Sequence, residues 1–394
     1  MTARKTPVRT GTMRATPGPE TRVKLERVRE YLDRHRLSGV VLATRGNVAW
    51  LTAGGDAHVV SQSDEAVGAI VVTAREAMLV TSEIEVDRLQ HEEPVRGLAA
   101  RTFPWTRSLA EAVTRVVGRD RSQWASDHPL ATALAALPGD FASDCRASLL
   151  PDEIERYEAL GRDCRDAIEA TCRALAVGET EHDVEARCAT ELLRRGVQPH
   201  VLLVGADARI RNFRHPIPTA RTIRRHVMVV VCGQRHGLIA SLTRFVHFGA
   251  LPKELANRHL ATCRVEAAMW EATQPGTTFG AIVAAGQRQY AKERVPDEWM
   301  LHHQGGPTGY AGRDFVAAPG EERAVQPQQA VAWNPSITGT KSEDTFIVMP
   351  PPLDAPATAR WERLVVTAAS PAWPVVTVTA PAGARLVRPA ILVR

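Results

Sequence analysis

Long hydrophobic runs are missing from this chain, and none approaches the roughly 18–20 apolar residues that a membrane-spanning helix needs. The six cysteines include no Cys-x-x-Cys pair, which argues against a zinc ribbon or a thioredoxin-like site. No apolar stretch follows the basic N-terminal residues, so we expect no secretory signal and a cytoplasmic location. The net charge is +5, but no basic stripe is interleaved with aromatic residues, so we expect neither nucleic acid nor a membrane as a partner.

The composition that remains is that of a globular protein with more than one domain. Hydrophobic residues make up 44% of the chain and charged residues 24%. A length of 394 residues exceeds a single ordinary core, so we expect two domains. Residues 1–20 are rich in Thr, Pro, Gly and Arg and are expected to form a disordered tail. The two domains are then predicted at residues 21–150 and 151–394.

The first domain alternates helical and strand patterns. Leu25, Val28 and Leu32 repeat at the spacing of one helix face. Short apolar runs bounded by polar turns follow and indicate strands at residues 40–42, 69–72 and 77–80. Strands mixed with helices over about 130 residues predict a small α/β domain.

The second domain opens with signals for two long helices. Pro151 followed by two acidic residues is typical of a helix start, and Gly178 ends the apolar face that follows. Thr180 with Asp183 indicates a second helix, which ends at Gly196. An apolar strand is expected at 227–232 and helices at 252–272 and 279–292. This order predicts an α+β domain.

Six segments in this order resemble the creatinase / aminopeptidase P family. They are GNVAWLTAGG (46–55), SEIEVDRLQHEE (82–93), RHPIPTARTIRR (214–225), VVVCGQRHGLIASLTR (229–244), LHHQGGPTGY (301–310) and VAWNPSITGTKSEDT (331–345). The resemblance implies a C-terminal "pita-bread" domain, a curved antiparallel sheet covered by helices, with a smaller α/β domain before it. It also implies a homodimer that acts on a small-molecule substrate.

The same resemblance draws attention to missing metal ligands. Metallopeptidases of the family hold two divalent ions with five side chains, mostly carboxylates. Four of the five positions fall here on Val230 or Val231, Ser241, Pro307 and Asn334. Only Glu343 remains, so we expect no metal and no other cofactor. The alternative is a single ion held by His302 and His303 together with Glu343.

Titratable residues nevertheless remain in these segments. His215 resembles the histidine that transfers protons in creatinase, and its ordinary pKa near 6.5 suits that role. His302 and His303 point to opposite faces if they lie on a strand, which favours His303 as the catalytic one. Strand alternation places Lys341 on the same face as Glu343, the third catalytic candidate.

Other polar residues are candidates for binding substrate. Arg244 presents a planar fork that suits a carboxylate, although a salt bridge bracing the sheet is the alternative. Ser241 and Asn334 offer neutral hydrogen bonds. The complete set of substrate-binding candidates is His302, Arg244, Asn334, Lys341, Ser241 and Tyr310. Cys232 follows an apolar strand and is expected to pack in the core.

Three functions agree with these observations. The first is a metal-independent enzyme that hydrolyses a C–N bond of a small amino-acid-like molecule, or catalyses a related elimination, cyclisation or isomerisation. The departure from the peptidase pattern suggests a specialised biosynthetic pathway for such an enzyme. The second is a metal-dependent Xaa-Pro aminopeptidase or dipeptidase. The third is a catalytically inactive ligand-binding member of the fold.

Overall fold

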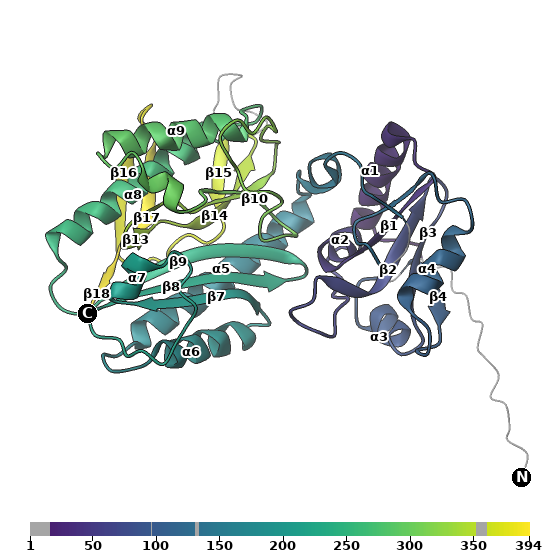
Figure 1. Cartoon of the computed structure of the whole chain (residues 1–394), viewed down its shortest axis with the longest axis horizontal. Helices are drawn as coiled ribbons and strands as arrows, with labels where there is room; N and C mark the ends of the chain where they lie inside the picture. Colours follow the sequence, from purple (N-terminus) through teal and green to yellow (C-terminus); the bar gives the residue numbers. More distant parts are fainter. Residues whose placement is uncertain (1–15, 96, 131–133, 352–360) are drawn as a thin grey trace, which may run out of the picture. The chain divides into compact units, whose positions relative to one another are not determined.

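The computed structural model describes residues 16–95, 97–130, 134–351 and 361–394 (Figure 1). Two compact units make up the chain, Met1–Cys145 and Arg146–Arg394. Most of the tail expected at residues 1–20 lies outside the described residues. Its last two residues are helical, because the first helix begins at Pro19.

The N-terminal unit is a mixed six-stranded sheet in the order β4-β3-β2-β1-β5-β6, with helices beside it. β1 pairs antiparallel with β2 and parallel with β5, while β3 pairs antiparallel with β2 and parallel with β4. Val113 of α4 packs with Val41, Val71 and Val80 on one face of this sheet. Its elements are α1 (Pro19–His35), β1 (Gly39–Thr44), α2 (Arg45–Leu51), β2 (Glu65–Thr73), β3 (Ala77–Ser82), α3 (Val86–His91), β4 (Ala99–Phe103), α4 (Leu109–Val117), β5 (Trp124–Ser126), β6 (Ala135–Ala136) and a π-helical turn (Ala142–Arg146).

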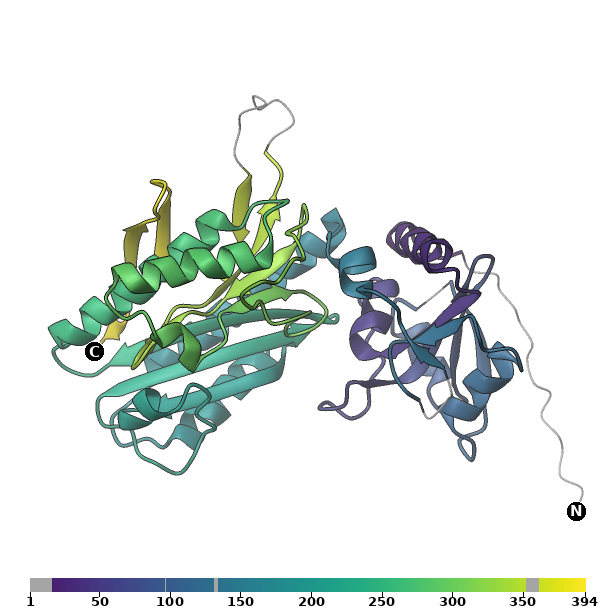
Figure 2. The same ribbon diagram turned by 45° about the horizontal axis from the view of Figure 1, so that its top comes forward.

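In its described residues, the C-terminal unit has two four-stranded sheets, in the orders β18-β9-β8-β7 and β10-β11-β14-β15, and two short two-stranded ones. Helices α8 and α9 (green) cover the strands on one side, and α5 and α6 (teal) on the other (Figures 1 and 2). Its elements are α5 (Pro151–Ala174), α6 (Glu181–Leu193), β7 (Gln198–Ala206), α7 (Ala208–Asn212), β8 (His226–Arg235), β9 (Leu238–His247), α8 (Lys253–Ala272), α9 (Phe279–Lys292), a 3₁₀ turn (Glu298–Leu301), β10 (Gly305–Thr308), β11 (Ala330–Trp333), β12 (Ser336–Ile337), β13 (Thr340–Lys341), β14 (Asp344–Met349), β15 (Glu362–Val365), β16 (Val375–Thr379), β17 (Arg385–Pro389) and β18 (Leu392–Val393).

The long helices of this unit start where the sequence indicates. Pro151 is the first residue of α5, and the backbone N–H of Leu150 donates to the Glu153 carboxylate. Thr180 and Asp183 form a reciprocal capping box at the start of α6. These caps satisfy backbone N–H groups that have no partner within the helix. The helix positions expected from the sequence are therefore confirmed.

Hydrogen bonds join β9 directly to the segment at residues 343–345. The Thr243 N–H donates to the Glu343 carbonyl over 3.1 Å. The Ser241 N–H donates to Thr345 Oγ1 over 2.8 Å, and this hydroxyl donates back to the Ser241 carbonyl. These bonds connect the two four-stranded sheets and place side chains from both in one small region. Among the described residues, no helix is long and apolar enough to cross a membrane.

Candidate functional site

One wall of the candidate site is formed by β8 and β9. Their antiparallel register pairs Cys232 with Ser241 and Val230 with Thr243, so these four side chains share a face. Ser241 Oγ lies 3.2 Å from the Cys232 sulfur. Val231 belongs to the opposite face, so of the two alternatives for the first Asp position only Val230 shares the face of Ser241. Cys232 is partly buried on this face, and burial raises the pKa of its thiol, so the prediction that it packs in the core is neither confirmed nor contradicted.

A cation–carboxylate cluster, Lys341, Glu343 and Arg313, lies next to this wall. Lys341 Nζ is 2.7 Å from Glu343 Oε2, and Arg313 Nη2 is 3.4 Å from Oε1. Thr243 Oγ1 donates to Oε2 over 2.7 Å, and Arg313 Nη1 donates to Ser241 Oγ over 3.3 Å. Burial acts to raise the pKa of Glu343, but the two cations and the hydroxyl outweigh it and hold the pKa below its usual value.

Arg313 is the site residue that sequence reasoning missed. It lies three residues beyond the end of the segment 301–310. A search for cations just beyond the family-like segments therefore identifies it. Its Nε is buried and has no hydrogen-bond partner among the described residues. A buried guanidinium with an unsatisfied donor is costly unless a ligand supplies an acceptor.

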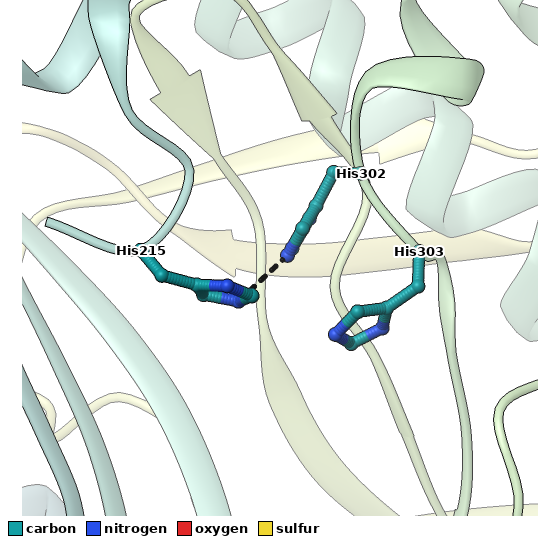
Figure 3. A group of neighbouring side chains, drawn as sticks. All are labelled: His215, His302 and His303. Atoms are coloured by element: carbon teal, nitrogen blue, oxygen red, sulfur yellow. Dashed lines mark hydrogen bonds between the residues drawn. The ribbon is translucent and has the colours of Figure 1, made fainter.

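Three imidazoles, His215, His302 and His303, form what we call the histidine cluster (Figure 3). The Nε2 atoms of His215 and His302 are 3.1 Å apart, and one ring nitrogen from each of the three lies within 4.8 Å of the others. The rings of His302 and His303 have centroids 4.5 Å apart. The condition for opposite faces, a strand at His302 and His303, is not met, because residues 302–304 precede β10, and both rings lie in the cluster.

His215 reaches the cluster from the loop between α7 and β8. Arg214 beside it donates to the Glu298 carboxylate over 2.8 Å and to Thr338 Oγ1 over 2.9 Å. These two contacts hold the loop against the segment that leads to His302. His215 itself is exposed, whereas His302 is buried.

The surroundings of the histidine cluster favour neutral rings. Burial, assisted by the charge of Lys341, lowers the pKa of His302 to about 2. Burial, assisted by Arg313 and Lys341, lowers the pKa of His303 to about 4. Burial and Lys341 also lower the pKa of His215. All three imidazoles are therefore neutral near pH 7 and have a lone pair available.

Gly305 brings the next strand close to the histidine cluster. Its φ is +104°, and a Cβ there would lie 2.2 Å from the Ala332 carbonyl oxygen, so no other residue fits without a shift. The Asn334 N–H donates to the Gln304 carbonyl over 3.0 Å. Asn334 Oδ1 is buried, and within the described part of the chain it has no hydrogen-bond partner.

The structure corrects two of the substrate-binding predictions. Arg244 is fully buried, lies 3.1 Å from the Asp344 carboxylate and donates to the Thr367 carbonyl over 2.8 Å. Tyr310 is buried and donates to the Glu153 carboxylate over 2.7 Å. Both side chains brace the fold. The salt-bridge alternative for Arg244 is therefore the one that the contacts support.

A sequence model of metallopeptidase family M24 matches residues 155–368, which is more than half of the chain. The chain belongs to metallopeptidase family M24. The resemblance to this family is confirmed, as is the α+β class, with a pita-bread C-terminal unit that follows a smaller α/β unit along the chain. A search of curated proteins finds no match.

Several solved structures have the same fold as this chain. Dipeptidase PepE from Mycobacterium ulcerans is 17% identical with a TM-score of 0.71, over 95% of this chain and 98% of that one. The prolidase from Pyrococcus horikoshii OT3 is 15% identical with a TM-score of 0.71, over 88% and 98%. The N-terminal domain of FACT complex subunit SPT16 from Cicer arietinum is also similar, with 12% identity and a TM-score of 0.66 over 89% and 97%. At these identities the likeness establishes the fold alone.

The side chains of this M24 site do not fit a centre in which several carboxylates bridge two divalent ions. Both oxygens of Glu343 already lie against cations, Lys341 and Arg313. The neighbouring polar groups are the hydroxyls of Ser241 and Thr243, which are weak ligands for a divalent ion. Fixed positive charges beside a lone carboxylate repel an added cation.

Proposed function

We propose that this M24 protein hydrolyses a C–N bond in a small, carboxylate-bearing, amino-acid-like substrate without a resident metal ion. The observation that carries the proposal is the cation–carboxylate cluster beside three neutral imidazoles. Lys341, Arg313 and Glu343 together have a net charge of +1, and the histidines add none at pH 7. A partly buried pocket with this charge favours an anionic ligand.

Arg313 is the residue best placed to bind the substrate carboxylate. Its unsatisfied Nε and its long contact of 3.4 Å to Glu343 leave part of the guanidinium fork for a ligand. Ser241 and Asn334 supply neutral hydrogen-bonding groups in the same region. Ile210 and Met228 line a small hollow beside His302 and Lys341, with a volume of only about 10 Å³.

Proton transfer in this proposal belongs to His215 and His303. A neutral imidazole takes the proton of a water molecule as that water attacks the carbon of the C–N bond. The same proton then goes to the nitrogen that leaves, so the proton balance closes without another reactant. His302 positions His215 through the 3.1 Å contact between their Nε2 atoms. Glu343 holds Lys341 in place through their ion pair. Its negative charge also partly offsets the lowering of the histidine pKa by Lys341.

The test uses chelator-treated full-length protein and a panel of Xaa-Pro dipeptides and amidino-substituted amino acids. Turnover of at least one substrate should persist after chelation. It should be abolished in His215→Ala, whose side chain is exposed and therefore dispensable for folding. His182→Ala is the matched control, because His182 lies exposed on α6 and pairs with Glu185. Equal rates in His215→Ala and the wild type would exclude the assigned role.

A metal-dependent Xaa-Pro peptidase is the second candidate. Family membership favours it, together with the similarity to structures named as prolidases and dipeptidases. Under this alternative, chelation abolishes hydrolysis of Xaa-Pro dipeptides and manganese or cobalt restores it. The same chelation experiment therefore separates the two functions.

A further inference from the structure

The histidine cluster contains one more imidazole than a proton-transfer pair requires. His302 Nε2 and His215 Nε2 face each other across 3.1 Å, and a nitrogen of His303 lies within 4.8 Å of both (Figure 3). Two neutral imidazoles at this distance share one proton. The third ring cannot join that hydrogen bond, and its lone pair stays available.

The spacing of the first two rings matches that of ligands on one metal ion. Tetrahedral zinc binds imidazole nitrogen at about 2.0–2.1 Å, which places two such nitrogens about 3.3 Å apart. The pair formed by His215 and His302 is already within a few tenths of an ångström of this distance. His303 is only partly buried and His215 is exposed, so small side-chain rotations close the remaining gap.

We propose that His215, His302 and His303 bind one divalent ion of the borderline class, Zn²⁺ or Co²⁺, and that this ion inhibits the enzyme reversibly. Imidazole suits these ions, and three such ligands leave a fourth position for water. The inhibition rests on the proposed function, because the ion takes the lone pairs that His215 and His303 use for proton transfer. The binding itself does not depend on it.

The surroundings explain why such an ion is exchangeable. Lys341 contributes positive charge close to all three rings and Arg313 close to His303, which opposes a divalent cation. The Nδ1 atoms of His302 and His303 are buried without an acceptor in the described residues. Metal-binding histidines normally donate this second N–H to a carboxylate or carbonyl, and losing such a partner weakens binding by about 10–100-fold.

The binding test is a Co²⁺ titration of chelator-stripped full-length protein, followed by visible absorption. The wild type should bind one equivalent, which Zn²⁺ then displaces. His215→Ala and His302→Ala should each weaken binding by more than about 100-fold, since the loss of a ligand exceeds the loss of an outer partner. His182→Ala should bind as the wild type does. Since His215 is exposed, its variant reports binding even if His302→Ala fails to fold.

Inhibition is measured on the same samples with the substrate found by the panel. Turnover should fall with added Zn²⁺ at the concentration that displaces Co²⁺, and chelator should restore it. Wild-type protein without one equivalent of bound Co²⁺, or His215→Ala with unchanged affinity, would overturn the metal site and leave the proposed function intact. Activation by the bound ion would overturn both the inhibition and the metal-independent function.

Discussion

Replacing Glu343 with Gln should strongly destabilise the C-terminal unit. Glu343 and Lys341 are 4% and 5% exposed, and their charged atoms are 2.7 Å apart. Glutamine keeps the size of the side chain but leaves Lys341 as a buried, unpaired cation with Arg313 nearby. Breaking a buried ion pair from one side costs about 3–5 kcal/mol. For a unit of this size we expect Tm to fall by roughly 6–20 °C.

The pH dependence of this loss of stability follows from the lowered pKa of Glu343. Because the folded-state pKa lies below the ordinary glutamate value of 4.5, the stabilisation is complete above that pH and is lost as the pH falls through the folded-state pKa. The difference in stability between Glu343→Gln and the wild type should therefore be largest at pH 7 and should shrink in acid. Calorimetry of both proteins at several pH values measures it.

An exposed ion pair of the same unit serves as the control for this variant. Glu254 of α8 is 2.7 Å from Arg258, but its side chain is 73% exposed. Glu254→Gln should change stability by less than about 1 kcal/mol, as exposed pairs do. If Glu343→Gln proves as mild as this control, Lys341 is not held as a buried charge, and the electrostatic account of the site fails.

Three other variants or treatments have definite expected outcomes. Burial, assisted by His247, lowers the pKa of His226 to about 4, so the wild type loses stability as the pH falls below 6.5. His226→Phe should avoid about 3 kcal/mol of that loss in denaturant titrations down to about pH 4. Gly305→Ala should cost at least about 1–2 kcal/mol in the same assay, because of its φ of +104° and the close Ala332 carbonyl. A thiol reagent should modify only Cys232 in native protein, and modification of further thiols would contradict the described burial.

The sequence was most informative where local chemistry decides the structure. The structure has helix starts where local signals predict them. Proline and acidic residues mark the start of α5, and the capping box at Thr180 marks the start of α6. The spacing of apolar residues located α1 and the strands β1 to β3 for the same reason. These features depend on neighbours within a few residues, so one sequence contains them completely.

The candidate site depends on contacts between distant residues, and there the sequence was less informative. Arg313 meets Glu343 because the loop after β10 and the segment at 343–345 are both hydrogen-bonded to β9, which no local pattern reveals. His302 and His303 converge because their segment is not a strand, so the alternation of side chains along a strand does not apply to them. Arg244 lies in a family-like segment, but its partners Asp344 and Thr367 are visible only in the fold.

The electrostatics of the site combine into one physical argument. In a two-ion centre, carboxylates supply negative charge and the metals supply the positive charge that polarises the substrate. Here the positive charge belongs to the chain, as Lys341 and Arg313, and a single carboxylate holds both. Burial and the same cations lower the pKa of the nearby imidazoles, which keeps the rings neutral at pH 7 and also makes them weaker bases. The positive charge of the site and the neutral state of its histidines at pH 7 therefore have a common origin.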